Sequence, residues 1–251
     1  MNAIGSNAVL TAFVLFCRIS GCLMLMPGFS SPRVPVTVRL FLCVAITLAL
    51  TPFLGGEIEK LVADASALVL LKLIVSETLI GGLIGLMGRI FFAALETLGT
   101  SIAMQIGLAN ALGAPVDDSE PLPSIADFLT FLATALLFVT DLHLEVIRGI
   151  VASYRTLPVA SGFGAQFGLI QVADTLSKSF FLGLRVASPF ILFGLIFNLA
   201  VGLANKLTPQ IQVYFIATPF AVAGGLFLLY FTFKQVIELF MAGFANWLAG
   251  G

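Results

Sequence analysis

The chain has 251 residues and a formal net charge of −1; 59% of its residues are hydrophobic and only 10% are charged. A soluble domain carries about 25% charged residues, so this composition excludes an ordinary water-soluble globule and requires contact with lipid, other apolar subunits, or both. The balanced charge also gives no indication of a nucleic-acid partner.

Three apolar segments in the first part of the chain predict helices. The first covers residues 9–26 and the second residues 39–54, where the proline and glycines of 52–56 are expected to close it. An acidic polar link over 57–64 follows, and the third segment covers 67–92. At 1.5 Å per residue this third segment is long enough to cross the roughly 30 Å hydrocarbon core of a bilayer.

The stretch from residue 96 to residue 125 differs from its apolar neighbours. It begins as helix-compatible sequence and then becomes a short acidic, proline-rich segment. The characteristic residues are Gly99, Gly107, Gly113, Asp117, Asp118, Glu120, Pro121 and Pro123. A polar, irregular segment between membrane-type helices is costly unless it lies in water, in protein or along an aqueous pathway. We therefore expect a loop in or beside a conduit.

The second half of the chain predicts further helices. Residues 125–139 are apolar, a charged stretch follows, and apolar residues continue to 154. A glycine-containing turn is expected over 157–168. The long segment 171–205 contains Pro189, which should kink it and free one carbonyl.

The C-terminal part predicts a helical hairpin between about residues 180 and 235. A tight turn over 206–210 leads into a return helix over 211–233 that is kinked near Pro219, and an amphipathic tail occupies 234–251. The fold class is thus an all-α integral-membrane-type protein of kinked helical hairpins.

The basic residues give a mixed answer for topology. Arg33 and Arg39 place the first loop in the cytoplasm, but Lys206 then falls on the opposite side if every segment crosses fully. Either some segments span only half of the membrane, or the protein does not lie in the bilayer as a simple series of full crossings in alternating directions.

The residues with reactive side chains do not form a catalytic or metal-binding motif. Cys17, Cys22 and Cys43 all lie in apolar runs without a CxxC spacing, which is typical of buried structural thiols. His143 is the only histidine, and its acidic neighbours alternate along the chain and do not share a helix face. No nucleotide-binding loop or nucleophile motif is present, so we expect no enzyme, no cofactor and no metal.

Two patterns of small residues predict close helix packing. Gly81 and Gly85 form a GxxxG motif, which lets another helix approach closely. A second stripe recurs on one face of the 171–205 helix and combines glycines with amides: Gly194, Asn198, Gly202 and Asn205. This stripe is suited to binding another protein helix through interhelical hydrogen bonds.

Seven ionisable residues lie in or at the edges of the apolar segments: Arg18, Lys72, Glu77, Arg89, Glu96, Arg185 and Glu238. Charges at membrane depth pair, face a cavity or mark function. Pairing between helices or subunits is one reading, and a proton relay coupled to transport is the other.

An ordered set of residues resembles the FliR family, the export-gate subunits of bacterial flagellar type III secretion, related to the SctT proteins of injectisomes. The C-terminal matches are Pro189, Phe190, Asn198, Gly202, Asn205, Pro209, Gln210 and Pro219. Those before and after the central loop are Glu96, Gly99, Met104, Gln105, Gly107, Leu108, His143, Leu144, Leu157 and Pro158. A looser N-terminal likeness rests on Arg18, Pro27, Pro35 and Arg39.

The resemblance implies a non-enzymatic, multi-pass subunit of the flagellar basal body in the bacterial inner membrane. It implies assembly with FliP-like and FliQ-like subunits, with FlhB-like and FlhA-like export components as further partners, besides membrane lipid. The gate would pass unfolded flagellar protein. Residues 1–170 would be the FliP-like part and 171–251 the FliQ-like hairpin and C-terminal helix.

The resemblance also implies a plug over about residues 107–122. The residues expected to form it are Gly107, Leu108, Leu112, Gly113, Pro115 and Val116. Family loops often carry phenylalanine, whereas here none occurs between Phe92 and Phe128. Subunit packing is expected at Gly81, Gly85, Arg89, Glu96, Gln105, Asn198, Gly202, Asn205, Pro209 and Gln210.

A stand-alone ion or small-solute transporter is the alternative function. It would use Glu77, Arg89 and Glu96 as a relay, and it predicts transport by the purified chain in liposomes. A membrane scaffold for polymer synthesis is a third class, with no motif in its favour.

Overall fold

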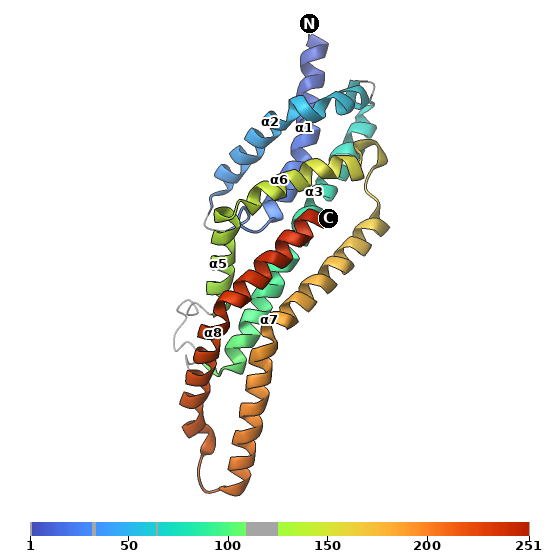
Figure 1. Cartoon of the computed structure of the whole chain (residues 1–251). Helices are drawn as coiled ribbons and strands as arrows, with labels where there is room; N and C mark the ends of the chain where they lie inside the picture. Colours follow the sequence, from blue (N-terminus) through green and yellow to red (C-terminus); the bar gives the residue numbers. More distant parts are fainter. Residues whose placement is uncertain (1, 32–33, 64, 109–124, 251) are drawn as a thin grey trace. The chain divides into compact units, whose positions relative to one another are not determined.

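The computed structural model describes residues 2–250 apart from 32–33, 64 and 109–124 (Figure 1). Its elements are α1 (Asn2–Leu25), α2 (Val36–Ala63), α3 (Ala67–Gln105), α5 (Ile125–Val139), α6 (Leu142–Thr156), the short 3-10 helix η1 (Val159–Ser161), α7 (Ala165–Leu207) and α8 (Val213–Gly250). No strand occurs in the described part of the chain, so the predicted all-α class is confirmed.

Five helices are long and apolar enough to cross a membrane: α1, α2, α3, α7 and α8. The short helices α5 and α6 together would count as a sixth, broken span. The multi-pass, membrane-type character expected from composition is confirmed by these lengths.

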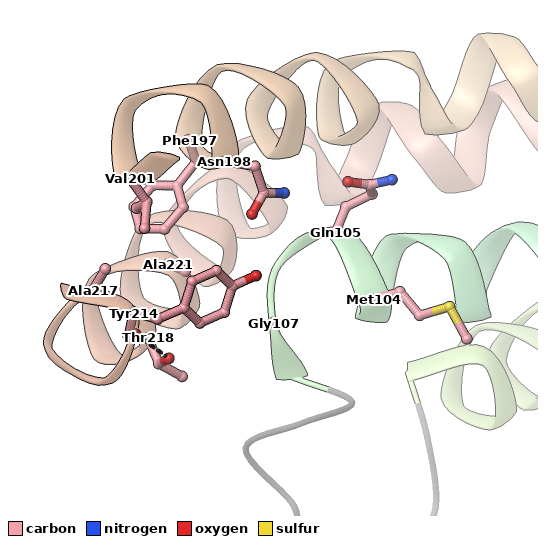
Figure 2. Close-up of a pocket in the computed structure, with 10 residues that line it drawn as sticks. All are labelled: Met104, Gln105, Gly107, Phe197, Asn198, Val201, Tyr214, Ala217, Thr218 and Ala221. Carbon is pink, nitrogen blue, oxygen red and sulfur yellow. Dashed lines mark hydrogen bonds between the residues drawn. The ribbon is translucent and has the colours of Figure 1, made fainter. Parts of the chain in front are cut away.

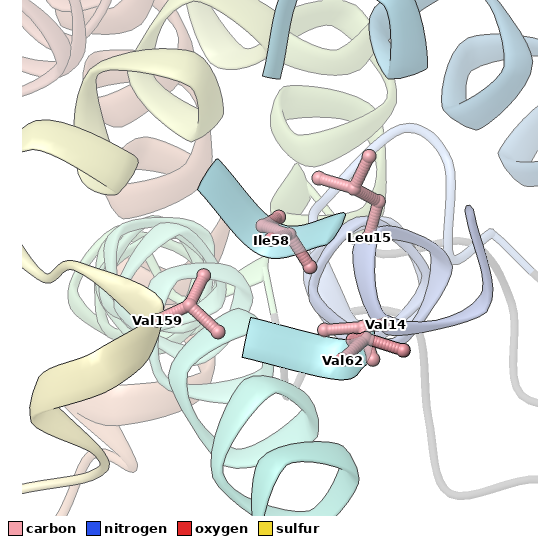
Figure 3. Close-up of a cluster of buried hydrophobic side chains, with 5 residues drawn as sticks. All are labelled: Val14, Leu15, Ile58, Val62 and Val159. Atoms are coloured by element: carbon pink, nitrogen blue, oxygen red, sulfur yellow. The ribbon is translucent and has the colours of Figure 1, made fainter. Parts of the chain in front are cut away.

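Helix α2 corrects the prediction that a polar link follows residue 56. The helix continues through Pro52 to Ala63. Ile58 and Val62 are almost completely buried in this last part. Figure 3 shows them with Val14 and Leu15 of α1 and Val159 of η1 in one apolar cluster. Proline removes only one backbone donor, and the burial of this apolar face outweighs that loss.

Helices α3, α7 and α8 are longer than the sequence predicted. Helix α3 runs past Phe92 to Gln105, α7 begins at Ala165, and the expected C-terminal tail is the continuation of α8.

The proline inside α7 is accommodated by its neighbour. Pro189 cannot donate to the carbonyl of Arg185, and the hydroxyl of Ser188 donates to that carbonyl instead, at 2.9 Å. The freed carbonyl therefore has a partner, and the helix continues.

The chain forms two compact units, which are described separately here. The first contains Met1–Phe91, Leu137–Ser177 and Leu248–Gly251, and the second Phe92–Leu136 and Lys178–Trp247. The predicted division at residue 170 follows the family resemblance and stays a prediction. In the first unit Cys17, Cys22 and Cys43 are buried free thiols, as the sequence indicated.

Candidate functional site

A buried ion pair lies at the centre of the first unit. Arg18 of α1 and Glu77 of α3 are both 0% exposed. The Arg18 guanidinium donates from Nε to one carboxylate oxygen at 2.6 Å and from a terminal nitrogen to the other at 2.7 Å. This bidentate geometry is the strongest form of the arginine–carboxylate interaction.

The C-terminal part of helix α6 completes the coordination of Arg18. The guanidinium donates to the hydroxyl of Ser153 at 3.1 Å and to the carbonyl of Leu157 at 3.0 Å. It also lies 3.9 Å from the ring centre of Tyr154, a cation–π contact. Both oxygens of Glu77 are occupied, so the geometry favours structural pairing over a proton relay.

Two glycines of α3 make this ion pair possible. A Cβ added at Gly81 would collide with the backbone of Arg18, and one at Gly85 with the backbone of Cys22. From α1, a Cβ at Gly21 would lie 2.8 Å from the carbonyl oxygen of Thr78. The two helices are thus in backbone contact, as in other small-residue helix pairs in membranes. The GxxxG motif contacts a helix of the same chain.

The other ionisable residues of the apolar helices are exposed: Lys72, Arg89, Glu96, Arg185 and Glu238. Glu238 lies 3.7 Å from Lys234 one helical turn earlier. Within the chain, burial and pairing are thus found for Arg18 and Glu77, and the pairing of the other five with other subunits stays a prediction. Hydropathy cannot distinguish the face of a long helix that is packed from the face that is not.

The end of helix α3 is the principal site of the second unit. Ile106 is 0% exposed and packs directly against Gly225 of α8. Gln105 packs against Gly194 of α7. Gly107 has a φ of +75°, a left-handed conformation that L side chains rarely adopt, so the helix cannot continue through it.

A pocket of about 80 Å³ adjoins this helix end (Figure 2). It is lined by Met104, Gln105, Gly107, Phe197, Asn198, Val201, Tyr214, Ala217, Thr218 and Ala221, which come from the end of α3 and from α7 and α8. The hydroxyl of Thr218 donates to the backbone carbonyl of Tyr214 at 2.8 Å. The amides of Gln105 and Asn198 and the hydroxyls of Tyr214 and Thr218 give the pocket four polar side chains.

The predicted stripe of glycines and amides on α7 divides into two parts. Gly194 is buried against Gln105, and Asn198 lines the pocket although its side chain is largely exposed. Gly202 and Asn205 are exposed, and a Cβ added at Gly202 would meet no atom within 4 Å. Pro209 and Gln210 lie in the exposed turn between α7 and α8.

Of the expected plug residues, Gly107 and Leu108 are described and lie directly at the end of α3. Leu112, Gly113, Pro115 and Val116 lie outside the described residues. The sequence reading missed Ile106 and Gly225 because both are ordinary residues in apolar helices. The adjacent glycines at 224 and 225 were the available signal.

His143 lies against an aromatic ring. Its ring packs 5.3 Å from that of Phe138. Within the described ranges, no group of three or more His, Cys, Asp or Glu could hold a metal ion. The nearby Asp141 adopts a left-handed φ of 58° at the break between α5 and α6.

Comparison with known proteins identifies the family. The model of the family described as "Bacterial export proteins, family 1" matches residues 9–247. The chain belongs to this family. Curated relatives narrow the identification to flagellar proteins. The chain is 33% identical over 229 residues to the flagellar biosynthetic protein FliR of Caulobacter vibrioides, covering 89% of this chain and 90% of the relative.

Two further FliR relatives show how widely the similarity extends. The protein of Escherichia coli is 29% identical, covering 84% of this chain and 80% of the relative. The protein of Bacillus subtilis is 26% identical, covering 84% and 82%. The expected FliR membership is thus confirmed. The chain has a role in flagellar export, as a multi-pass membrane protein of the flagellar apparatus.

Proposed function

We propose that the chain is a non-enzymatic subunit of the gate through which unfolded flagellar proteins leave the cell. It encloses the pore together with FliP-like and FliQ-like subunits in the inner membrane and the basal body, next to FlhB-like and FlhA-like components. Residues 107–122 close the pore at rest.

The observation that carries this proposal is the position of the break at Gly107. The apolar helix α3 has 39 residues and ends at Gln105, and the left-handed turn follows two residues later. The family resemblance places the start of the plug at the same residue. A segment that leaves a packed helix through a glycine can change direction without moving the helix that carries it.

The exposed apolar surface supports a need for partners. Large hydrophobic side chains on α7 and α8 are more than half exposed, among them Leu192, Leu195, Leu199, Phe215, Phe220, Phe227 and Phe231. Such surface is stable only against lipid or other apolar helices. FliP-like and FliQ-like subunits supply such helices in the proposed complex, and lipid covers what they leave exposed.

The transporter alternative is less well supported by the geometry. It needs Glu77 to exchange protons along a pathway, but both of its oxygens accept hydrogen bonds from Arg18, and Arg89 and Glu96 are exposed. Purified chain reconstituted alone in liposomes should therefore move no ions or small solutes. Solute uptake by the lone chain would favour the transporter.

Co-expression and pull-down tests the assembly. A tagged chain is expected to co-purify with FliP-like and FliQ-like subunits in a defined complex after detergent extraction. Recovery of the tagged chain alone, with the other subunits present in the membrane, would contradict the gate assignment.

Deletion of residues 109–120 tests the plug. Cells expressing the whole gate with this deletion are expected to leak ions and small solutes, because the closing segment is gone. A variant carrying a glycine–serine linker of equal length serves as the control for chain continuity and should leak as well. Wild-type conductance in both variants would contradict the plug role.

A further inference from the structure

We propose that Gly194 and Gly225 are positioning residues for the end of helix α3. They form a seat, defined as the contacts of Gly194 with Gln105 and of Gly225 with Ile106, which fixes the direction in which the chain leaves the helix. The consequence of this seat for gating rests on the proposed function, whereas the seat itself can be tested without it. Gly194 belongs to the predicted stripe on α7, whereas the sequence had given Gly225 on α8 no role.

The first contact of the seat is between Ile106 and Gly225. A Cβ added at Gly225 would overlap the Cβ and Cγ2 of Ile106 and lie 3.1 Å from its Cα. An isoleucine side chain could rotate away from a clash at its tip, but the Cβ and Cα cannot move without the backbone. Only glycine at 225 therefore leaves room for the helix end where it now lies.

The second contact is between Gln105 and Gly194. A Cβ at Gly194 would lie 3.0 Å from Cδ and 3.1 Å from Cβ of Gln105, besides overlapping its amide oxygen. Two successive residues of the chain are thus held by glycines on two different helices. One contact would leave the helix end free to rotate about it, whereas two contacts fix its orientation.

The left-handed turn at Gly107 adjoins the seat. A Cβ built on Gly107 would lie 3.7 Å from the Cβ of Ala221, one helical turn before Gly225 on α8. The residue with the left-handed φ therefore itself lies close to helix α8. The direction of departure is set by packing, since the turn has no room to swing towards α8.

Position along α3 distinguishes these contacts from ordinary helix packing. Other glycines of the second unit also receive side chains of neighbouring helices: Gly183 contacts Leu98, Gly243 contacts Leu182, and Gly99 contacts Ala126. Those contacts lie before the end of α3 or between α7 and α8, and they remain when the seat is altered. A variant at Gly194 or Gly225 should thus preserve assembly and displace only the helix end.

Disulfide trapping tests the seat directly. In the assembled gate, with Cys17, Cys22 and Cys43 replaced by alanine, Gly107→Cys and Ala221→Cys should crosslink on mild oxidation, because a Cβ separation of 3.7 Å suits a disulfide. The Gly107→Cys substitution strains the left-handed turn, so crosslinking rates are compared only among variants that all carry it. Adding Gly225→Ala or Gly194→Ala should slow this crosslinking about tenfold, since disulfide geometry tolerates little displacement. Gly149→Ala, at a glycine of helix α6 whose added Cβ would meet no atom within 4 Å, is the control and should leave the rate unchanged.

Co-purification and ion leak are measured on the same variants. We expect normal assembly and an increased leak for Gly194→Ala and Gly225→Ala. If Gly225→Ala lowers assembly, Ile106→Ala removes the seated side chain without adding an atom and should slow crosslinking in the same way. Wild-type crosslinking rates in all these variants would overturn the seat. Slowed crosslinking with wild-type leak would leave the seat standing and count against the plug.

Discussion

Helix α3 is held by opposite means in the two units of the molecule. In the first unit its glycines accept the backbone of α1, and a buried ion pair locks the contact. In the second unit Gly99 also accepts a neighbour, Ala126 of α5, but Leu98, Gln105 and Ile106 enter spaces left by glycines of other helices, without a buried ion pair among the described residues. Loss of one partner in the first arrangement leaves a buried charge unpaired, whereas the second arrangement contains only van der Waals contacts.

The difference indicates that the first part of helix α3 is firmly anchored, whereas its end can adjust its position. A buried bidentate pair has a steep free-energy cost for any separation of its partners, since each charge would lose its oppositely charged partner. Van der Waals contacts against glycine lose far less per contact. The part of α3 that leads into the proposed closing segment is held by the weaker kind of contact.

Loss of one charge in the first unit is expected to have the largest effect. Glu77→Ala leaves Arg18 buried without its partner, which should lower the free energy of unfolding by about 3–5 kcal/mol. Thermal unfolding of the detergent-solubilised gate measures it, and Glu238→Ala, an exposed carboxylate of the second unit, is the control that should change nothing measurable.

The pair can also be removed as a whole. Replacing both Arg18 and Glu77 with leucine should recover most of the stability that Glu77→Ala loses, because no unpaired charge remains. A double variant as unstable as the single one would mean that the contacts of Arg18 with helix α6, which only the double variant loses, stabilise the protein by as much as removal of the unpaired charge restores.

Disruption of the glycine contact between α1 and α3 is expected to have the second-largest effect on the free energy of unfolding. Gly81→Ala would place a methyl group in the backbone of Arg18 and should cost about 1–3 kcal/mol. The next residue offers the control: a Cβ at Gly82 meets only the tip of Leu25 at 3.8 Å. Gly82→Ala should be neutral or stabilise by up to about 1 kcal/mol, through helix propensity. Equal effects of the two substitutions would show that no close helix contact exists here.

The hydroxyl beside Pro189 should have the smallest effect. Ser188→Ala removes the donor to the carbonyl of Arg185 and should cost about 1 kcal/mol. Pro189→Ala restores the backbone donor, so in that background the loss of the hydroxyl should cost less. A double-mutant cycle on thermal stability measures this coupling, and additivity would contradict the compensation described above.

Part of the candidate site could be read from the sequence. The boundary at Gly107 was expected only from the family resemblance, and its physical reason is that glycine favours the left-handed conformation in which a helix ends. The close helix approach at Gly81 and Gly85 was predictable from local sequence, since small residues one turn apart leave a flat surface. Its partner was not, because many apolar helices could fit such a surface.

Local rules failed where tertiary burial overrode them. Pro52 and the polar residues after it indicated a helix end, but Ile58 and Val62 are buried against α1 and extend α2 through this region. The contact between Ile106 and Gly225 could not be predicted from the sequence, because Gly225 lies far along the chain in an otherwise uniform apolar helix.

Composition and hydropathy by themselves determined that this is an all-helical, multi-pass membrane protein, because apolar content and segment length depend on no partner. Only the tertiary structure decided which charges are buried. Arg18 and Glu77 are 59 residues apart, and Ser153 is 135 residues from Arg18. Such contacts depend on how whole helices pack, and no local pattern in the sequence encodes them.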